Sequence, residues 1–164
     1  RAEATRVSSP RRALERVNRL LLDMNEDGMF VTVLYGILDA GQGTFTYARA
    51  GHELPLILTA AGDSCLAEPG KGAPLGLFES VGLDEQTIAL SSGDALLIYS
   101  DGATDITAGS DELFGMERLI ASACVAMRYG RGQALCDAIW RDIDAYRGGA
   151  ALADDVTLVA VRAA

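Results

Sequence analysis

The spacing of apolar residues predicts a helix near the beginning of the chain. Five of them recur at the three- and four-residue intervals of one helix face, with arginines on the other face: Leu14, Val17, Leu20, Leu21 and Met24. The stretch Ser8-Ser9-Pro10 precedes them, and a hydroxyl cap followed by proline is typical of a first helical turn. We therefore expect a helix that begins at this stretch and ends at residues 25–28.

Apolar and alternating runs predict strands in the middle and at the end of the chain. The expected strands cover residues 29–39, 44–50, 55–60, 81–90 and 95–99, and a last one that begins at Thr157. A glycine-rich turn at 41–43 and a corner at 51–53 join the first three. We therefore expect these three to form an antiparallel meander.

The remaining residues read as one loop and two helices. Residues 62–80 are rich in glycine and proline, which predicts a loop. Helical spacing predicts helices over 113–127 and 133–146. With 164 residues the chain suits a single domain over 1–164, and these elements are compatible with a two-layer α+β domain.

Charge is unevenly distributed along the chain. The net charge is −9, but residues 1–22 contain six arginines and two glutamates, so they carry +4 and the remainder carries −13. An acidic body argues against a nucleic-acid partner. It suits a protein that binds cations, and equally one that is simply soluble.

The cysteines and the histidine limit metal chemistry to oxygen ligands. Cys65, Cys124 and Cys136 lack metal-finger spacing, and we interpret them as small core residues in a reducing, cytoplasmic compartment. With His52 as the sole histidine, a structural zinc site is not expected. His52 itself is interpreted as a hydrogen-bonded corner residue, with a general acid as the alternative. No apolar run approaches the ~20 residues that span a bilayer.

Aspartates stand at the ends of two apolar strands. Asp101 follows the strand 95–99, and Asp154 and Asp155 precede the last strand. Strand ends of one sheet can lie side by side, and carboxylates that converge there repel one another unless a cation lies between them. All-oxygen ligands select Mg²⁺ or Mn²⁺, which can activate water and hold phosphate oxygens. The alternative is that these aspartates form turns or cap helices.

Several motifs, in order, resemble one protein family. They are "FVTVLYGILDAGQGTFTYARAGHELPLIL", "GAPLGL", "SSGDALLIYSDGATD", "ELFGMERL" and "ADDVTLVAV". They are similar to the metal-dependent protein serine/threonine phosphatases of the PPM type (protein phosphatase type 2C), in the bacterial SpoIIE/RsbU-like branch. The resemblance implies an α-β-β-α sandwich of two antiparallel sheets flanked by helices.

The resemblance also implies roles for individual residues. Asp101 and Asp154 correspond to metal ligands and therefore to catalytic residues of the family. Asp105 and Asp155 are additional candidate ligands. Asp105 stands where an acid of the family can help hold an outer metal. Gly102 would let the backbone pass close to the metals. The complete domain is expected to hold two Mn²⁺ or Mg²⁺ ions.

One family motif has no counterpart in the sequence. An earlier Asp-Gly signature, whose aspartate bridges both metals in the family, is not matched by residues 1–28, since Asp27-Gly28 follows a helix and not a strand. The fold is therefore expected to be incomplete at its N-terminal side, either because the chain is truncated or because the natural protein is a degenerate phosphatase. The absence of an initiator Met and a start that reads as the tail of a helix favour truncation.

Two functions remain open at this point. The first is hydrolysis of phosphoserine and phosphothreonine on a phosphorylated anti-sigma-factor antagonist, a STAS-type protein, with a sensor domain expected upstream and a sigma factor as the regulated output. The second is a catalytically degenerate module that binds the same partner. Another acid-rich metal hydrolase would not explain the ordered motifs. An incomplete domain can also expose a sheet edge, so we expect a homodimer through that edge.

Overall fold

The structure is a computed structural model that describes residues 9–24, 28–109, 112–128, 130 and 132–164. It divides into two compact units, each described here by itself. Unit 1 comprises residues 1–54 and 68–89, and unit 2 comprises residues 55–67 and 90–164. Each unit contains one antiparallel sheet with helical cover, which confirms the predicted α+β class with two antiparallel sheets. No described helix is both long and apolar enough to cross a membrane.

Unit 1 packs one helix against a three-stranded sheet. Helix α1 spans Pro10–Met24, and the strands β1 (Val33–Asp39), β2 (Thr44–Ala50) and β5 (Glu85–Ala89) pair in the order β1-β2-β5. The predicted helix is confirmed, with Pro10 at its first position and Ser9 Oγ accepting a hydrogen bond from the Arg12 amide at 3.3 Å. Ser8 and the expected helix tail before it lie outside the described residues.

The core of unit 1 uses a narrower face of α1 than its apolar spacing predicts. Leu14 is buried and packs with residues of β2 and of the 75–83 segment, whereas Leu20 and Met24 are exposed. Asn18 lies on the buried face, 1% exposed. The alternation of β2 is confirmed, because Phe45 and Tyr47 are both buried and their rings stack at 5.7 Å.

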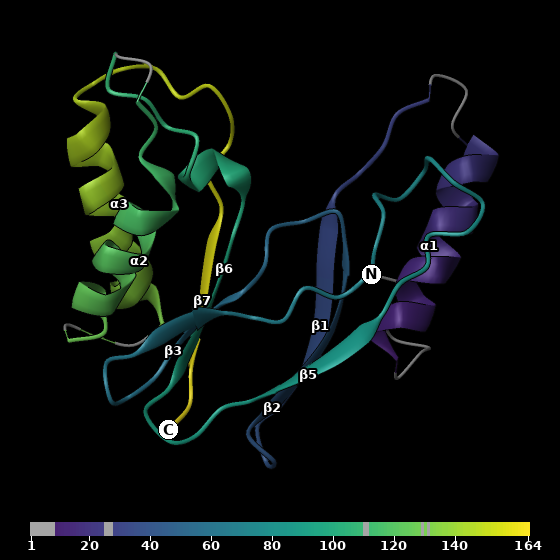
Figure 1. The fold of residues 1–164 in the computed structure, drawn as a ribbon, viewed down its shortest axis with the longest axis horizontal. Helices are drawn as coiled ribbons and strands as arrows, with labels where there is room; N and C mark the ends of the chain where they lie inside the picture. The colour runs from purple at the N-terminus through teal and green to yellow at the C-terminus, as the bar shows by residue number, and fades with distance from the viewer. Residues whose placement is uncertain (1–8, 25–27, 110–111, 129, 131) are drawn as a thin grey trace. The chain divides into compact units, whose positions relative to one another are not determined.

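Unit 2 packs two helices against a four-stranded sheet. The strands β3 (Leu56–Leu58), β4 (Ser64–Leu66), β6 (Ala95–Tyr99) and β7 (Leu158–Arg162) pair in the order β4-β3-β6-β7. Helices α2 (Gly115–Ala126) and α3 (Gln133–Arg147) lie side by side in Figure 1 and share a core with the sheet, in which Leu97, Leu119 and Ile139 are fully buried. A short 3₁₀ helix at Asp101–Ala103 follows β6.

Several predictions about strands are wrong, in their bounds or in their pairing. Strand β1 begins at Val33 and not at residue 29, and β5 begins at Glu85 and not at residue 81. The meander fails because β3 pairs with β4 and β6, not with β2, so the 51–53 corner carries the chain from one sheet into the other. Residues 62–80 are not all loop, since they contain β4. The last strand begins at Leu158, one residue after Thr157, because the Thr157 amide bonds Ser100 Oγ.

The cysteines only partly fit the predicted core role. Cys124 is half-buried and packs against the core of unit 2, and Cys136 is also half-buried. Cys65 is exposed on β4, because β4 is an edge strand whose burial is incomplete. The prediction of a core role is therefore wrong for Cys65.

Candidate active site

Asp101 lies on a tight turn at the end of β6. Its carbonyl accepts hydrogen bonds from the amides of Thr104 at 2.8 Å and Asp105 at 2.9 Å, and its Oδ1 accepts one from the Gly102 amide at 2.9 Å. Ala103, within the turn, is buried in the core of unit 2 and so fixes the turn against that core. Asp101 and Asp105 are both exposed, so the turn presents two carboxylates to solvent.

The second acidic segment lies beside this turn because β6 and β7 are neighbours. Tyr99 at the end of β6 is paired with Leu158 at the beginning of β7. Asp154 and Asp155, just before β7, are exposed, and Asp154 Oδ1 accepts a hydrogen bond from the Asp155 amide at 2.7 Å. The ends of two strands that are more than 50 residues apart in sequence thus carry acids at one end of the same sheet.

Ser100 joins the two acidic segments. Its hydroxyl donates to the Asp155 carbonyl at 3.0 Å and accepts from the Thr157 amide at 2.9 Å, while its own amide donates to the Thr157 carbonyl at 3.1 Å. Sequence reasoning assigned no role to Ser100. The signal that could have identified Ser100 is its position, as a polar residue between a buried strand and an acidic turn.

Gly102 allows the two segments to approach. It is buried, and a Cβ placed on it would overlap the carbonyl oxygen of Asp155 and lie 3.0 Å from the carbonyl carbon. Its φ is not positive, so the glycine is required for close packing and not for a left-handed conformation. The Asp101 turn and the Asp154–Asp155 backbone are therefore in contact at this glycine.

The donor set suits a hard divalent cation. Exposed carboxylates from two touching segments repel one another, and a cation between them would relieve that repulsion. Carboxylate oxygens are the ligands that Mg²⁺ and Mn²⁺ prefer. Within the described part of the chain, no group of three or more acidic, histidine or cysteine side chains is placed to hold a metal. The assignment of Asp101, Asp154, Asp105 and Asp155 as ligands remains a prediction.

The other candidate side chains have contacts of their own. His52 lies in unit 1, where its Nδ1 is 3.3 Å from the Glu53 carbonyl oxygen and its own carbonyl accepts a hydrogen bond from Arg49. These contacts fit the corner-residue interpretation. Cys136 lines a cavity of about 340 Å³ beside β7, together with Trp140 and Val156. Burial raises the pKa of the Cys136 thiol, which disfavours the reactive thiolate.

Comparison with known proteins identifies the family. The family model for stage II sporulation protein E (SpoIIE) matches residues 1–164. The chain is 27% identical over 133 residues to protein IcfG of Synechocystis sp.. The matched region covers 81% of this chain and 20% of IcfG. It is 28% identical over 96 residues to the phosphoserine phosphatase RsbU of Bacillus subtilis, covering 58% of this chain and 29% of RsbU. The chain thus spans less than a third of either relative.

Solved structures agree with this fold. The RsbU and RsbW domains of Rv1364c from Mycobacterium tuberculosis match with a TM-score of 0.75 and 27% identity, over 92% of this chain and 41% of that one. The phosphatase domain of SpoIIE from Bacillus subtilis matches in fold with a TM-score of 0.62 and 17% identity, over 93% of this chain and 65% of that one. The fold and the family model agree with the ordered motifs of the sequence, and the chain belongs to the stage II sporulation protein E (SpoIIE) family.

Proposed function

We propose that residues 1–164 belong to one metal-dependent protein phosphatase domain that hydrolyses phosphoserine and phosphothreonine. The observation that carries the proposal is the contact between the Asp101 turn and the Asp154–Asp155 segment, made by Ser100 and Gly102. Family membership and the similarity to the phosphoserine phosphatase RsbU support it. A single family model that matches both units supports one domain over 1–164.

Each site residue has a role in this proposal. Asp101 and Asp154 would hold Mn²⁺ or Mg²⁺, with two ions in the complete site. Asp105 and Asp155 would be additional ligands. Such ions stabilise negative charge on phosphoryl oxygens and provide a nucleophile at neutral pH. Ser100 would keep the two acidic segments in register. Gly102 would let the backbone of one segment lie against the other.

The proposed substrate is a phosphorylated anti-sigma-factor antagonist of the STAS type. The support is the similarity to RsbU and to a Mycobacterium tuberculosis chain in which an RsbU domain occurs with an RsbW domain. A sensor domain upstream and a cytoplasmic location belong to the same proposal. Most of the length of IcfG and RsbU lies outside the matched region, which leaves room there for further domains.

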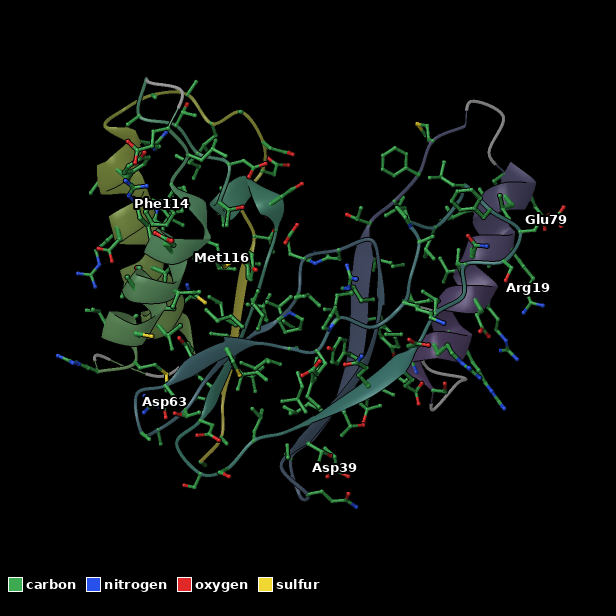
Figure 2. The ribbon with its side chains drawn as sticks, in the orientation of Figure 1. Arg19, Asp39, Asp63, Glu79, Phe114 and Met116 are labelled. Carbon is green, nitrogen blue, oxygen red and sulfur yellow. The ribbon has the colours of Figure 1, made fainter. Side chains whose placement is uncertain are left out.

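The test is Mn²⁺-dependent phosphate release from a phosphoserine protein by the natural full-length protein. Asp101→Asn should abolish turnover, because the amide removes a charged oxygen ligand, while circular dichroism shows a retained fold. Asp63→Asn is the matched control, since Asp63 is exposed on the β3–β4 turn (Figure 2). Leu58, before that turn, pairs with Ala95 at the opposite end of β6 from Asp101.

The outcomes separate the two functions. Loss of turnover in Asp101→Asn with normal turnover in Asp63→Asn supports the phosphatase. Full activity of Asp101→Asn would refute the ligand assignment. A folded natural protein without any Mn²⁺-dependent turnover would favour the degenerate, partner-binding module.

A further inference from the structure

The segment that follows Asp101 closes on itself through backbone hydrogen bonds. The carbonyl of Thr104 accepts a hydrogen bond from the Gly115 amide at 2.8 Å, and the carbonyl of Ile106 accepts one from the Phe114 amide at 2.7 Å. The Thr104 amide in turn donates to the Asp101 carbonyl at 2.8 Å. The arm that returns at residues 112–115 is therefore bonded to the arm that begins at Asp101.

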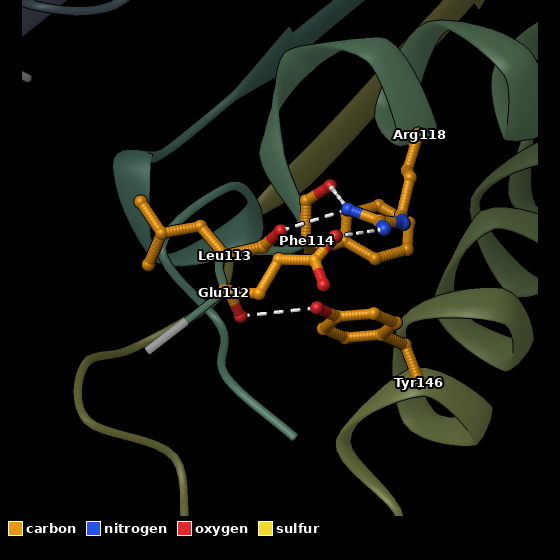
Figure 3. A network of polar contacts seen from close by, with 5 residues as sticks. All are labelled: Glu112, Leu113, Phe114, Arg118 and Tyr146. Atoms are coloured by element: carbon orange, nitrogen blue, oxygen red, sulfur yellow. Dashed lines mark hydrogen bonds and ion pairs between the residues drawn. The ribbon is translucent and has the colours of Figure 1, made fainter. Parts of the chain in front are cut away.

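Arg118 on α2 holds the returning arm by its backbone. Its Nη1 donates to the carbonyl oxygens of Leu113 at 3.0 Å and Phe114 at 3.2 Å, and its Nη2 bonds the carboxylate of Glu112 (Figure 3). The hydrogen bond to Glu112 raises the pKa of the Arg118 guanidinium, which is charged at any working pH in either case. One guanidinium thus binds three consecutive residues in a forked geometry that lysine cannot reproduce.

Tyr146 near the end of α3 completes the arrangement. Its hydroxyl donates to the Glu112 carbonyl at 3.0 Å, and its ring lies 4.9 Å from the Arg118 guanidinium carbon (Figure 3). The ring of Phe114 meets it edge-on, with centroids 5.4 Å apart. We call Glu112, Arg118 and Tyr146 the clamp. It ties the returning arm to both helices of unit 2.

The energetics of the clamp favour a positioning role. The side chains of Arg118 and Glu112 are 44% and 66% exposed, and exposed ion pairs contribute little to global stability. The contacts to main-chain carbonyls instead restrict where residues 112–114 lie. The hydrogen bond from the Gly115 amide to the Thr104 carbonyl, and the one from the Thr104 amide to the Asp101 carbonyl, then link the returning arm to the Asp101 turn.

We propose that the clamp is a positioning device for the proposed metal site, in which Arg118 fixes the returning arm and thereby the Asp101 and Asp105 carboxylates. The inference rests on the proposed function. The clamp touches neither aspartate directly, so it would act on metal affinity and not on the chemical step. Glu112, Phe114 and Arg118 all belong to the motif "ELFGMERL". We therefore assign the positioning role to that motif.

The test compares Arg118→Met, Arg118→Lys and Tyr146→Phe in the natural full-length protein. Calorimetric titration with Mn²⁺ alone should give a dissociation constant raised about three- to tenfold in Arg118→Met, less than the ~10–100-fold lost when a group bonded directly to a ligand is removed. Arg118→Lys and Tyr146→Phe should give smaller increases. Turnover should recover to the parent value at saturating Mn²⁺ in all three variants.

Hydrogen exchange and a control variant distinguish the role from general stabilisation. Hydrogen exchange in Arg118→Met should accelerate at the amides of Thr104, Phe114 and Gly115, with no change in the strands. Arg141→Ala is the matched control: Arg141 is an exposed arginine on α3 whose Nε donates to the Asp137 carbonyl of its own helix. It should leave Mn²⁺ affinity and exchange unchanged.

The outcomes keep this inference separate from the proposed function. An Arg118→Met protein that binds Mn²⁺ like the parent, while Asp101→Asn does not, would overturn the clamp and leave the metal site standing. Turnover that stays low in Arg118→Met at saturating Mn²⁺ would also contradict a positioning role. Unchanged Mn²⁺ affinity in Asp101→Asn would overturn the metal site itself.

Discussion

At the residue scale, Gly102 shows what a single absent Cβ does for this site. The sequence led us to expect a glycine that lets the backbone pass close to the metals, and the structure shows a close approach to the Asp155 carbonyl. Both roles depend on the missing side chain, but only the second is visible in the contacts. The neighbour 53 positions away could not be inferred from the local pattern, because it depends on the pairing of β6 with β7.

Replacing this glycine should separate the two acidic segments. Gly102→Ala is expected to destabilise the fold by about 1–3 kcal/mol, because the new Cβ overlaps main-chain atoms that cannot move without shifting a strand end. Urea denaturation measures this, and Mn²⁺ titration should show weaker binding. Gly41→Ala is the control, since its Cβ would meet only the end of the Asp39 side chain, and we expect a change within about 0.5 kcal/mol. Equal stabilities would refute the packing argument.

At the element scale, local signals located most helices and strands but not their partners. The predicted bounds of β2 and β6 agree with the structure. Helix α3 ends at Arg147, one residue beyond the prediction, where Gly148 adopts the left-handed conformation that terminates helices. Helix α1 was predicted from its apolar residues, yet its most informative buried residue is polar. Asn18 donates to the Phe78 carbonyl and accepts from the Gly76 amide, each at 2.8 Å.

Asn18 should therefore contribute to stability despite its polarity. Asn18→Ala would remove two hydrogen bonds from the buried face of α1, the one to the Phe78 carbonyl and the one from the Gly76 amide, so we expect a loss of about 2–3 kcal/mol in the free energy of unfolding. Thermal and urea denaturation measure it. Arg19→Ala, one position along on the exposed side of α1 (Figure 2), should change stability by less than about 0.5 kcal/mol. Similar losses for both variants would contradict the role of Asn18.

At the scale of the whole molecule, strand pairing leaves β7 at a sheet edge. Within the described residues β7 pairs only with β6, and Val159 on it is 47% exposed. A strand with an unpaired edge can pair with another chain. The homodimer expected from the sequence stays a prediction, and the β7 edge is where we propose that it forms.

Light scattering over a range of concentrations tests the dimer. We expect a dimer that Val159→Lys weakens at least tenfold, because a charged side chain on an edge strand opposes edge-to-edge pairing. Val125→Lys is the matched control, since Val125 is 46% exposed but lies on the helix α2 and not on a strand edge. A monomer at every concentration would rule out the dimer, and equal weakening by both variants would place it elsewhere.

The sequence by itself determined the family, the α+β class and the positions of most elements, because helical and strand periodicities and ordered motifs are local properties of the chain. It also identified Asp101 and Asp154 as the residues to examine. Only the tertiary structure decided that β3 leaves the first sheet, that Asn18 is buried and that Ser100 and Gly102 bring the acidic segments together. These features depend on hydrogen bonds and packing between residues distant in sequence, which local periodicity does not encode.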